Sequence, residues 1–118
     1  MTTMTTLATQ TCAPRSDALD DAALAALLPH VPDWTVSGGQ LSRAFTFKNY
    51  YQTIAFVNAL AYIAHSQDHH PELTVGYQLC TVHYRTHSVN QGGGGLSDND
   101  FICAAKADLL YAQRGTAA

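Results

Sequence analysis

The chain has 118 residues, of which 47% are apolar and only 13% are charged, and its formal net charge at pH 7 is -3. This length suits one domain with a single modest core. The weakly acidic balance, without any basic run, argues against a nucleic-acid-binding protein. Charged residues also fall well below the roughly 25% of an average globular protein, which suggests that an oligomer covers part of the surface.

The N-terminal stretch MTTMTTLATQTCAPRSD has neither the charged region nor the apolar region of a signal peptide. No stretch reaches the roughly 18 unbroken apolar residues of a membrane span. The three cysteines, Cys12, Cys80 and Cys103, are far apart and form no CxxC motif, which favours reduced thiols over a disulfide framework. We therefore expect a cytoplasmic protein with a flexible segment over residues 1–15 and a single domain over residues 16–118.

A first helix is predicted directly after the flexible segment. Ser16 can cap it, and Asp17 and Asp20 would lie near its N-terminus, where acidic side chains are favourable. Apolar residues at helical spacing continue from Leu19, and Pro29 ends the pattern.

A first β-hairpin is predicted next, over residues 34–47. Ser37, Gly38 and Gly39 give the turn signal. Leu41, Phe45 and Phe47 then share one face of a strand with Arg43, as expected for a hairpin strand with one mostly buried face.

A long helix is predicted from about Tyr50 to about Gln67. Asn49, with Gln52 three residues later, has the spacing of a capping box. The apolar residues of this segment form two stripes on different faces. One face should pack on the sheet, and the other is expected to pack on a partner subunit.

A second hairpin and a last helix complete the chain. Pro71 would stop the long helix, and the strand that follows the turn near Gly76 would direct three residues to the core, namely Cys80, Val82 and Tyr84. After a loop with four glycines, Ser97 and Asp100 have capping-box spacing for the last helix. The order α-β-β-α-β-β-α predicts an α+β fold, with a four-stranded antiparallel sheet and three helices on one face.

Most histidines of the chain fall in a short stretch, which holds His65, His69, His70, His83 and His87. Metal binding is one interpretation, because His65 and His69 are one helical turn apart and could share an ion. However, HSQDH lacks the Glu of an HExxH motif, and His83 and His87 would lie roughly 13 Å apart along a strand. No cysteine stands near a plausible ligand set, so the sequence favours a site without metal.

Acid–base chemistry is the other interpretation. The end of the long helix and the end of the last strand could bring His69, His70 and His87 to one polar pocket. Two or three histidines around a small molecule can donate one proton and accept another, which suits a dehydration without a cofactor. The alternative is purely structural, because histidines at a helix end often bond only the last carbonyls.

A linked motif resembles the pterin-4a-carbinolamine dehydratases. It consists of HSQDHHPE (residues 65–72), the pair Thr86-His87, a glycine-rich loop and LSDND (residues 96–100). Trp34 and the strand end FTFK (residues 45–48) also fit, so that the resemblance covers roughly residues 16 to 113. The four-glycine loop is longer than expected for the family and could change the substrate range.

The resemblance implies the fold predicted above and a homodimer or homotetramer. It also implies a lyase that removes water from 4a-hydroxytetrahydrobiopterin to give quinonoid dihydropterin, and so recycles the pterin cofactor of an aromatic amino-acid hydroxylase. Histidines would supply the acid and the base, with no metal and no cofactor. The alternative implied by other members is a non-catalytic binding, assembly or transcriptional-cofactor protein on the same fold.

The resemblance also assigns roles to individual residues. His69 and His87 are expected to be acids that serve the leaving hydroxyl, and His70 is expected to bind the pterin and accept a proton. Residues with a substrate-binding or supporting role would be His65, Pro71, Glu72 and Asp100. For Asp100 a role as a plain helix cap stays open, and His83 is expected to be a surface histidine outside the site.

Overall fold

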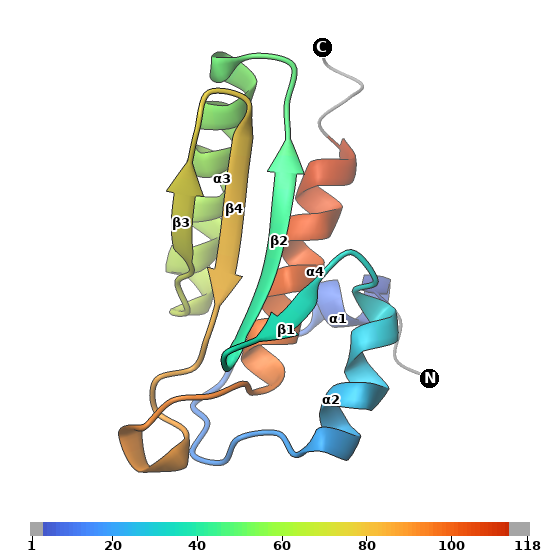
Figure 1. The fold of residues 1–118 in the computed structure, drawn as a ribbon, viewed down its shortest axis with the longest axis vertical. Coiled ribbons are helices and arrows are strands. Elements are labelled where there is room, and N and C mark those ends of the chain that lie inside the picture. The colour runs from blue at the N-terminus through green and yellow to red at the C-terminus, as the bar shows by residue number, and fades with distance from the viewer. Residues whose placement is uncertain (1–3, 114–118) are drawn as a thin grey trace.

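Four antiparallel strands form one sheet in the order β1-β2-β4-β3 (Figure 1). The computed structural model describes residues 4–113. Its strands are β1 (Thr35–Ser37), β2 (Gln40–Thr46), β3 (Glu72–Val75) and β4 (Leu79–Tyr84). Both predicted hairpins are therefore confirmed, β1 with β2 and β3 with β4. The β2–β4 pairing joins the two hairpins into one sheet.

The main helices are α2 (Asp21–Leu27), α3 (Tyr50–Gln67) and α4 (Asp98–Gln113), and a short helix, α1 (Met4–Thr9), precedes them. Figure 1 shows α3 behind β3 and β4, with α4 next to it behind β2. Two 3-10 turns add Leu28–His30 and Asn90–Gly92. The predicted α+β class is confirmed, with one helix more than expected. Among the residues described, no helix combines the length and the apolar character needed to cross a membrane.

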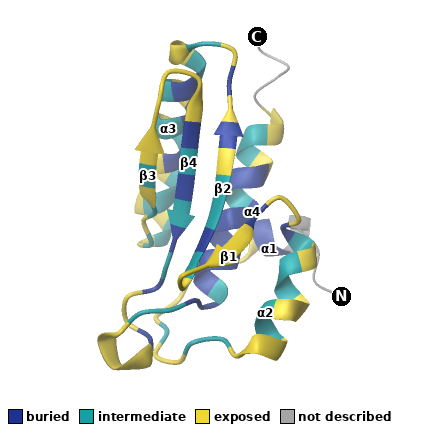
Figure 2. Cartoon of the chain, in the orientation of Figure 1, coloured by how far each residue is buried: buried dark blue, intermediate teal, exposed yellow. Residues whose placement is uncertain are grey.

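The core lies between the sheet and helices α3 and α4 (Figure 2). The alternation of the strands decides which side chains enter it. In β4, Cys80, Val82 and Tyr84 are fully buried, as predicted, and in β2 so are Leu41 and Phe45. The helices contribute another buried set, which includes Phe56, Leu60, Phe101 and Ile102.

The long helix begins as predicted. The Asn49 side chain accepts a hydrogen bond from the Gln52 amide at 2.9 Å, which satisfies one of the free amides of the first turn. The buried residues of α3 are Thr53, Phe56 and Leu60. The opposite side carries Tyr62, whose side chain is largely exposed. A partner subunit on the second apolar stripe of this helix stays a prediction.

The beginning of the chain differs from the prediction in two ways. Ser16 does not cap α2; instead Asp20 accepts a hydrogen bond from the Ala23 amide at 2.8 Å. The reason is that the chain before Asp20 is not helical: the Leu19 amide donates to the Leu96 carbonyl, at 2.8 Å, and the helix begins only after it. In addition, no helix was expected before residue 16, whereas Met4–Thr9 is helical and buries its last apolar residues against α4. The flexibility of residues 1–15 stays a prediction.

A buried polar cluster fixes α4 to the first hairpin. Asp108 on α4 accepts hydrogen bonds from the Trp34 indole at 2.7 Å and from the Arg43 guanidinium at 2.6 Å. Asp108 is 6% exposed, and the Arg43 guanidinium also lies 4.3 Å from the centre of the Phe45 ring. Removing the carboxylate would leave an indole N–H and a guanidinium without their buried acceptor.

We predict that Asp108→Ala lowers the free energy of unfolding by about 3 kcal/mol, because one partner of a buried charge pair is lost. Urea denaturation measures this change. The matched control is Asp33→Ala, since Asp33 also faces Arg43, at 3.6 Å, but is largely exposed. That variant should lose no more than about 0.5 kcal/mol. Equal losses in the two variants would contradict the role given to the buried cluster.

Candidate active site

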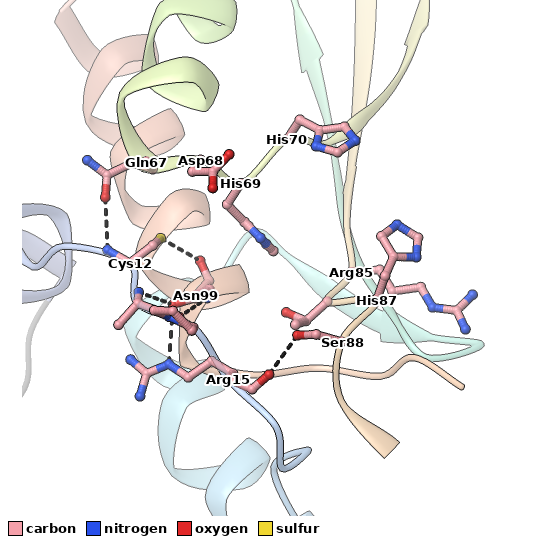
Figure 3. A pocket seen from close by; sticks show the side chains of 13 residues that line it. Cys12, Arg15, Gln67, Asp68, His69, His70, Arg85, His87, Ser88 and Asn99 are labelled. Atoms are coloured by element: carbon pink, nitrogen blue, oxygen red, sulfur yellow. Dashed lines mark hydrogen bonds between the residues drawn. The ribbon is translucent and has the colours of Figure 1, made fainter. Parts of the chain in front are cut away.

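A pocket of about 360 Å³ lies where the C-terminal end of α3, the segment after β4 and the first turn of α4 come together (Figure 3). The N-terminal segment closes one side of it. The lining residues come from four parts of the chain, namely residues 12–15, residues 67–70, residues 85–88 and Asn99. This volume lies within the range of sites that bind small molecules.

His69 owes its position to the way α3 ends. Asp68 has a left-handed backbone with φ of 50°, its amide bonds the His65 carbonyl at 3.3 Å, and the His69 amide bonds the Ala64 carbonyl at 3.1 Å. These two bonds close the last turn of the helix. The prediction that Pro71 stops the helix was therefore wrong, because the chain has already left the helix at Asp68. His69 and His70 lie in the connection after α3.

The side chain of His69 bonds Asp100, on α4. His69 Nε2 lies 2.7 Å from Asp100 Oδ1, and the two side chains are 11% and 0% exposed. The imidazole is also stacked parallel to the buried Tyr84 ring, with ring centres 5.9 Å apart. The ring of His69 is thus held by a hydrogen bond at its edge and by an aromatic contact on its face.

Asp100 caps the start of α4 and also bonds His69. Its Oδ2 accepts hydrogen bonds from the Ser97 amide at 2.9 Å and from the Thr86 hydroxyl at 2.8 Å, and its Oδ1 faces His69. The Ser97 hydroxyl lies 2.7 Å from that of Thr86, so it can donate to Thr86 while Thr86 donates to Asp100. The capping-box prediction is confirmed. The same carboxylate bonds His69, a residue of the pocket lining, through its other oxygen.

The pKa of His69 is raised above the usual value of 6.5. Burial by itself lowers it, because an imidazolium loses hydration. The hydrogen bond to Asp100 and the charge of that carboxylate outweigh burial, with smaller contributions from Cys12 and Asp68. Near neutral pH, His69 therefore holds a proton more readily than a free histidine does.

His70 and His87 line the same pocket but are exposed. Figure 3 shows both rings on the side of the pocket opposite Cys12. His87 follows Thr86, whose amide and carbonyl pair with Gly95 at 2.8 and 3.1 Å. The structure thus brings together the three histidines that were predicted to be catalytic, one of them partly buried and two exposed at the mouth of the pocket.

The other predicted residues lie around the pocket instead of lining it. His65 is exposed on α3, and Pro71 and Glu72 are absent from the lining set. Glu72 pairs with His83 in the sheet, and His83 Nδ1 lies 2.7 Å from the Ser42 hydroxyl. A supporting role for these residues stays a prediction. In residues 4–113, no three His, Cys, Asp or Glu side chains are grouped so that they could hold a metal ion.

The glycine-rich loop after His87 folds back beside the pocket. Gly94 has φ of 85°, and a side chain there would collide with the Arg85 guanidinium. That guanidinium donates to the Gly93 carbonyl at 2.7 Å. Glycine is therefore favoured at Gly94 mainly by its positive φ, since the Arg85 guanidinium is the end of a flexible side chain that can move aside.

The N-terminal wall of the pocket, residues 12–15, was not predicted from the sequence. Asn99 holds it, since the Asn99 side chain accepts from the Ala13 amide at 3.1 Å and donates to the Ala13 carbonyl at 2.7 Å. The Ser88 hydroxyl donates to the Arg15 carbonyl at 2.6 Å. Cys12 of this wall lines the pocket together with the histidines. The position of this wall could not be predicted, because the segment has no helical or strand periodicity and is held by residues that are distant in the sequence.

Comparisons with known proteins agree on one family. The sequence model of the family described as Pterin 4 alpha carbinolamine dehydratase matches residues 17–110. A Bdellovibrio bacteriovorus protein is 55% identical over 97 residues, which cover 82% of this chain and 81% of that protein. A Xylella fastidiosa protein is 51% identical over 118 residues, which cover 96% and 98%. Both carry the provisional name pterin-4-alpha-carbinolamine dehydratase.

A solved structure agrees with the sequence comparisons. The crystal structure of a protein from Brucella melitensis, described as a transcriptional coactivator/pterin dehydratase, is similar to this chain with a TM-score of 0.72 and 27% identity. The similarity covers 80% of this chain and 98% of that one.

We predict that Asp100→Asn moves the His69 pKa from above to below the usual value of 6.5, because the charge is lost while the burial that lowers the pKa remains. An NMR titration of the histidine ring protons in both proteins measures this. The matched control is Asp68→Asn, which removes a carboxylate of smaller influence and should lower the pKa less. An unchanged His69 pKa in Asp100→Asn would contradict the role of the His69–Asp100 pair.

Proposed function

The chain belongs to the Pterin 4 alpha carbinolamine dehydratase family, and we propose that it removes water from 4a-hydroxytetrahydrobiopterin to give quinonoid dihydropterin. The reaction would recycle the pterin cofactor of an aromatic amino-acid hydroxylase. The observation that carries this proposal is the hydrogen bond of His69 to the buried Asp100, in a pocket that His69, His70 and His87 line.

The leaving hydroxyl on C4a needs a proton, because hydroxide is a poor leaving group. His69 suits this task, since its raised pKa favours the protonated ring more than in a free histidine. Its Nε2 is engaged by Asp100, so the proton that reaches the substrate would leave from Nδ1. Asp100 would stay in place as the partner that orients the ring.

The first proton transfer takes a proton from the enzyme, and the second one gives a proton back to it. When the C4a–oxygen bond breaks, the electron pair on N5 forms the new double bond, and the proton on N5 must be accepted. His70 at the mouth of the pocket is assigned to that acceptance and to binding of the pterin. His87 is assigned as a second acid that serves the hydroxyl. The products are water and quinonoid dihydropterin, and the proton balance of the enzyme is restored.

A binding or transcriptional-cofactor protein on the same fold is the alternative function. The similar Brucella melitensis protein is described as a transcriptional coactivator as well as a pterin dehydratase. The presence of the complete histidine set favours catalysis in this chain, because a pure binding role does not require a buried, oriented acid. Rate measurements separate the two functions.

We predict that the wild-type protein accelerates the decay of 4a-hydroxytetrahydropterin, followed by its ultraviolet absorbance, well beyond the spontaneous dehydration. His69→Gln should lower that acceleration about 10²–10⁴-fold, the usual contribution of a positioned acid. His87→Gln should also lower the rate. A metal chelator should leave the wild-type rate unchanged.

The matched control is His83→Gln. His83 lies on β4, close to His87 in sequence, but it bonds Ser42 and does not line the pocket. This variant should keep the wild-type rate. If the wild-type protein binds a pterin without accelerating dehydration, the binding function replaces the catalytic one. If His69→Gln keeps the full rate, another residue is the acid.

A further inference from the structure

Two cysteines from distant parts of the chain meet behind the pocket wall. Cys12 in the N-terminal wall and Cys103 on α4 are 91 residues apart in the sequence, yet their Sγ atoms are 3.5 Å apart. Both are free thiols. Cys103 is fully buried, whereas Cys12 is half-buried and lines the pocket. One member of the pair is thus reached from the pocket and the other only through its partner.

Hydrogen bonds on both sides of the thiol hold Cys12 in this place. Its amide donates to the Gln67 side chain on α3 at 2.9 Å, and the next residue is paired with Asn99 on α4. The Cys12 thiol also lies 3.7 Å from the Asn99 carbonyl. These hydrogen bonds, and not only the contact between the thiols, hold the two sulfur atoms close together.

The two thiols are unlike each other. The hydrogen bond from Cys103 lowers the pKa of Cys12, against the effect of burial, and the nearby charges of His69 and Lys106 act in the same direction. The pKa of Cys103 is raised, because Cys103 donates to Cys12 and is buried. Cys12, which a reagent in the pocket can reach, is therefore the nucleophile of the pair, and the buried Cys103 is the thiol that can react with it afterwards.

We propose that Cys12 and Cys103 form a reversible disulfide that fastens the N-terminal wall of the pocket to α4. A disulfide bond is about 2.05 Å long, so the sulfurs need to approach each other by roughly 1.5 Å. Cys12 lies between α1 and α2, outside any helix or strand, where small backbone rotations can supply this movement. The bond would join the wall to the helix that carries Asp100, one turn away from it.

The oxidant is a hydroperoxide that enters through the pocket. The Cys12 thiolate attacks the peroxide oxygen, the O–O bond breaks, and Cys12 becomes a sulfenic acid while hydroxide or alkoxide leaves and is protonated. The Cys103 sulfur then attacks the Cys12 sulfur and expels water, with the Cys103 proton completing that water. Two thiols lose two electrons and two protons, and the peroxide is reduced to water, or to water and an alcohol.

The test treats the purified wild-type protein with one equivalent of hydrogen peroxide. Intact mass should fall by two hydrogen atoms, and peptide mapping should find Cys12 linked to Cys103. The melting temperature should rise by about 10 °C, because the bond closes a long loop of the unfolded chain. Dithiothreitol should reverse both changes. This outcome does not depend on the dehydratase activity.

Two variants serve as controls. Cys12→Ala should show neither the mass loss nor the rise in melting temperature. Cys80→Ala, which removes the buried cysteine of β4, should keep both responses. A peroxide-treated wild-type protein with free Cys103, with a sulfinic acid at Cys12, or with disulfides only between two molecules would overturn the proposal. An intramolecular mass loss that persists in Cys12→Ala would overturn it as well.

Discussion

The buried carboxylate of Asp100 is the group on which the pocket depends. It accepts hydrogen bonds from His69 after α3, from Thr86 after β4 and from the Ser97 amide at the start of α4. A carboxylate without exposure needs such donors, since an unmet acceptor in the interior is costly. One side chain therefore joins three chain segments, and the pocket lies where these segments meet. The same interaction orients the buried histidine and raises its pKa.

The two adjacent histidines have different environments because they lie in the connection between α3 and β3. The left-handed Asp68 ends the helix, and the connection that follows directs His69 inward to Asp100 while His70 stays exposed. Such a pair suits a reaction that moves two protons, with a buried ring held in one orientation and an exposed ring free to adjust. In the proposed dehydration, His69 and His70 take these two tasks.

Local patterns in the sequence predicted much of the fold. Alternation placed Cys80, Val82 and Tyr84 in the core, and capping spacing identified Asn49 and Asp100 at helix starts. Within the site, the histidines could be singled out, but the bond between His69 and Asp100 could not be predicted from spacing, because it joins residues on different elements. The N-terminal wall was missed for a related reason. It has no periodicity of its own and is held by Asn99 and Gln67.

The proposed dehydration requires that this pocket takes a pterin with its reacting atoms against the histidines. A crystal structure of the protein with bound 7,8-dihydrobiopterin, which resembles the product and cannot lose water, tests this most directly. The pterin ring should fill the pocket, with C4a facing His69 and within about 3.5 Å of a ring nitrogen of His69 or His87. A pterin bound outside the pocket, or bound with C4a and N5 turned away from both histidines, would contradict the claim.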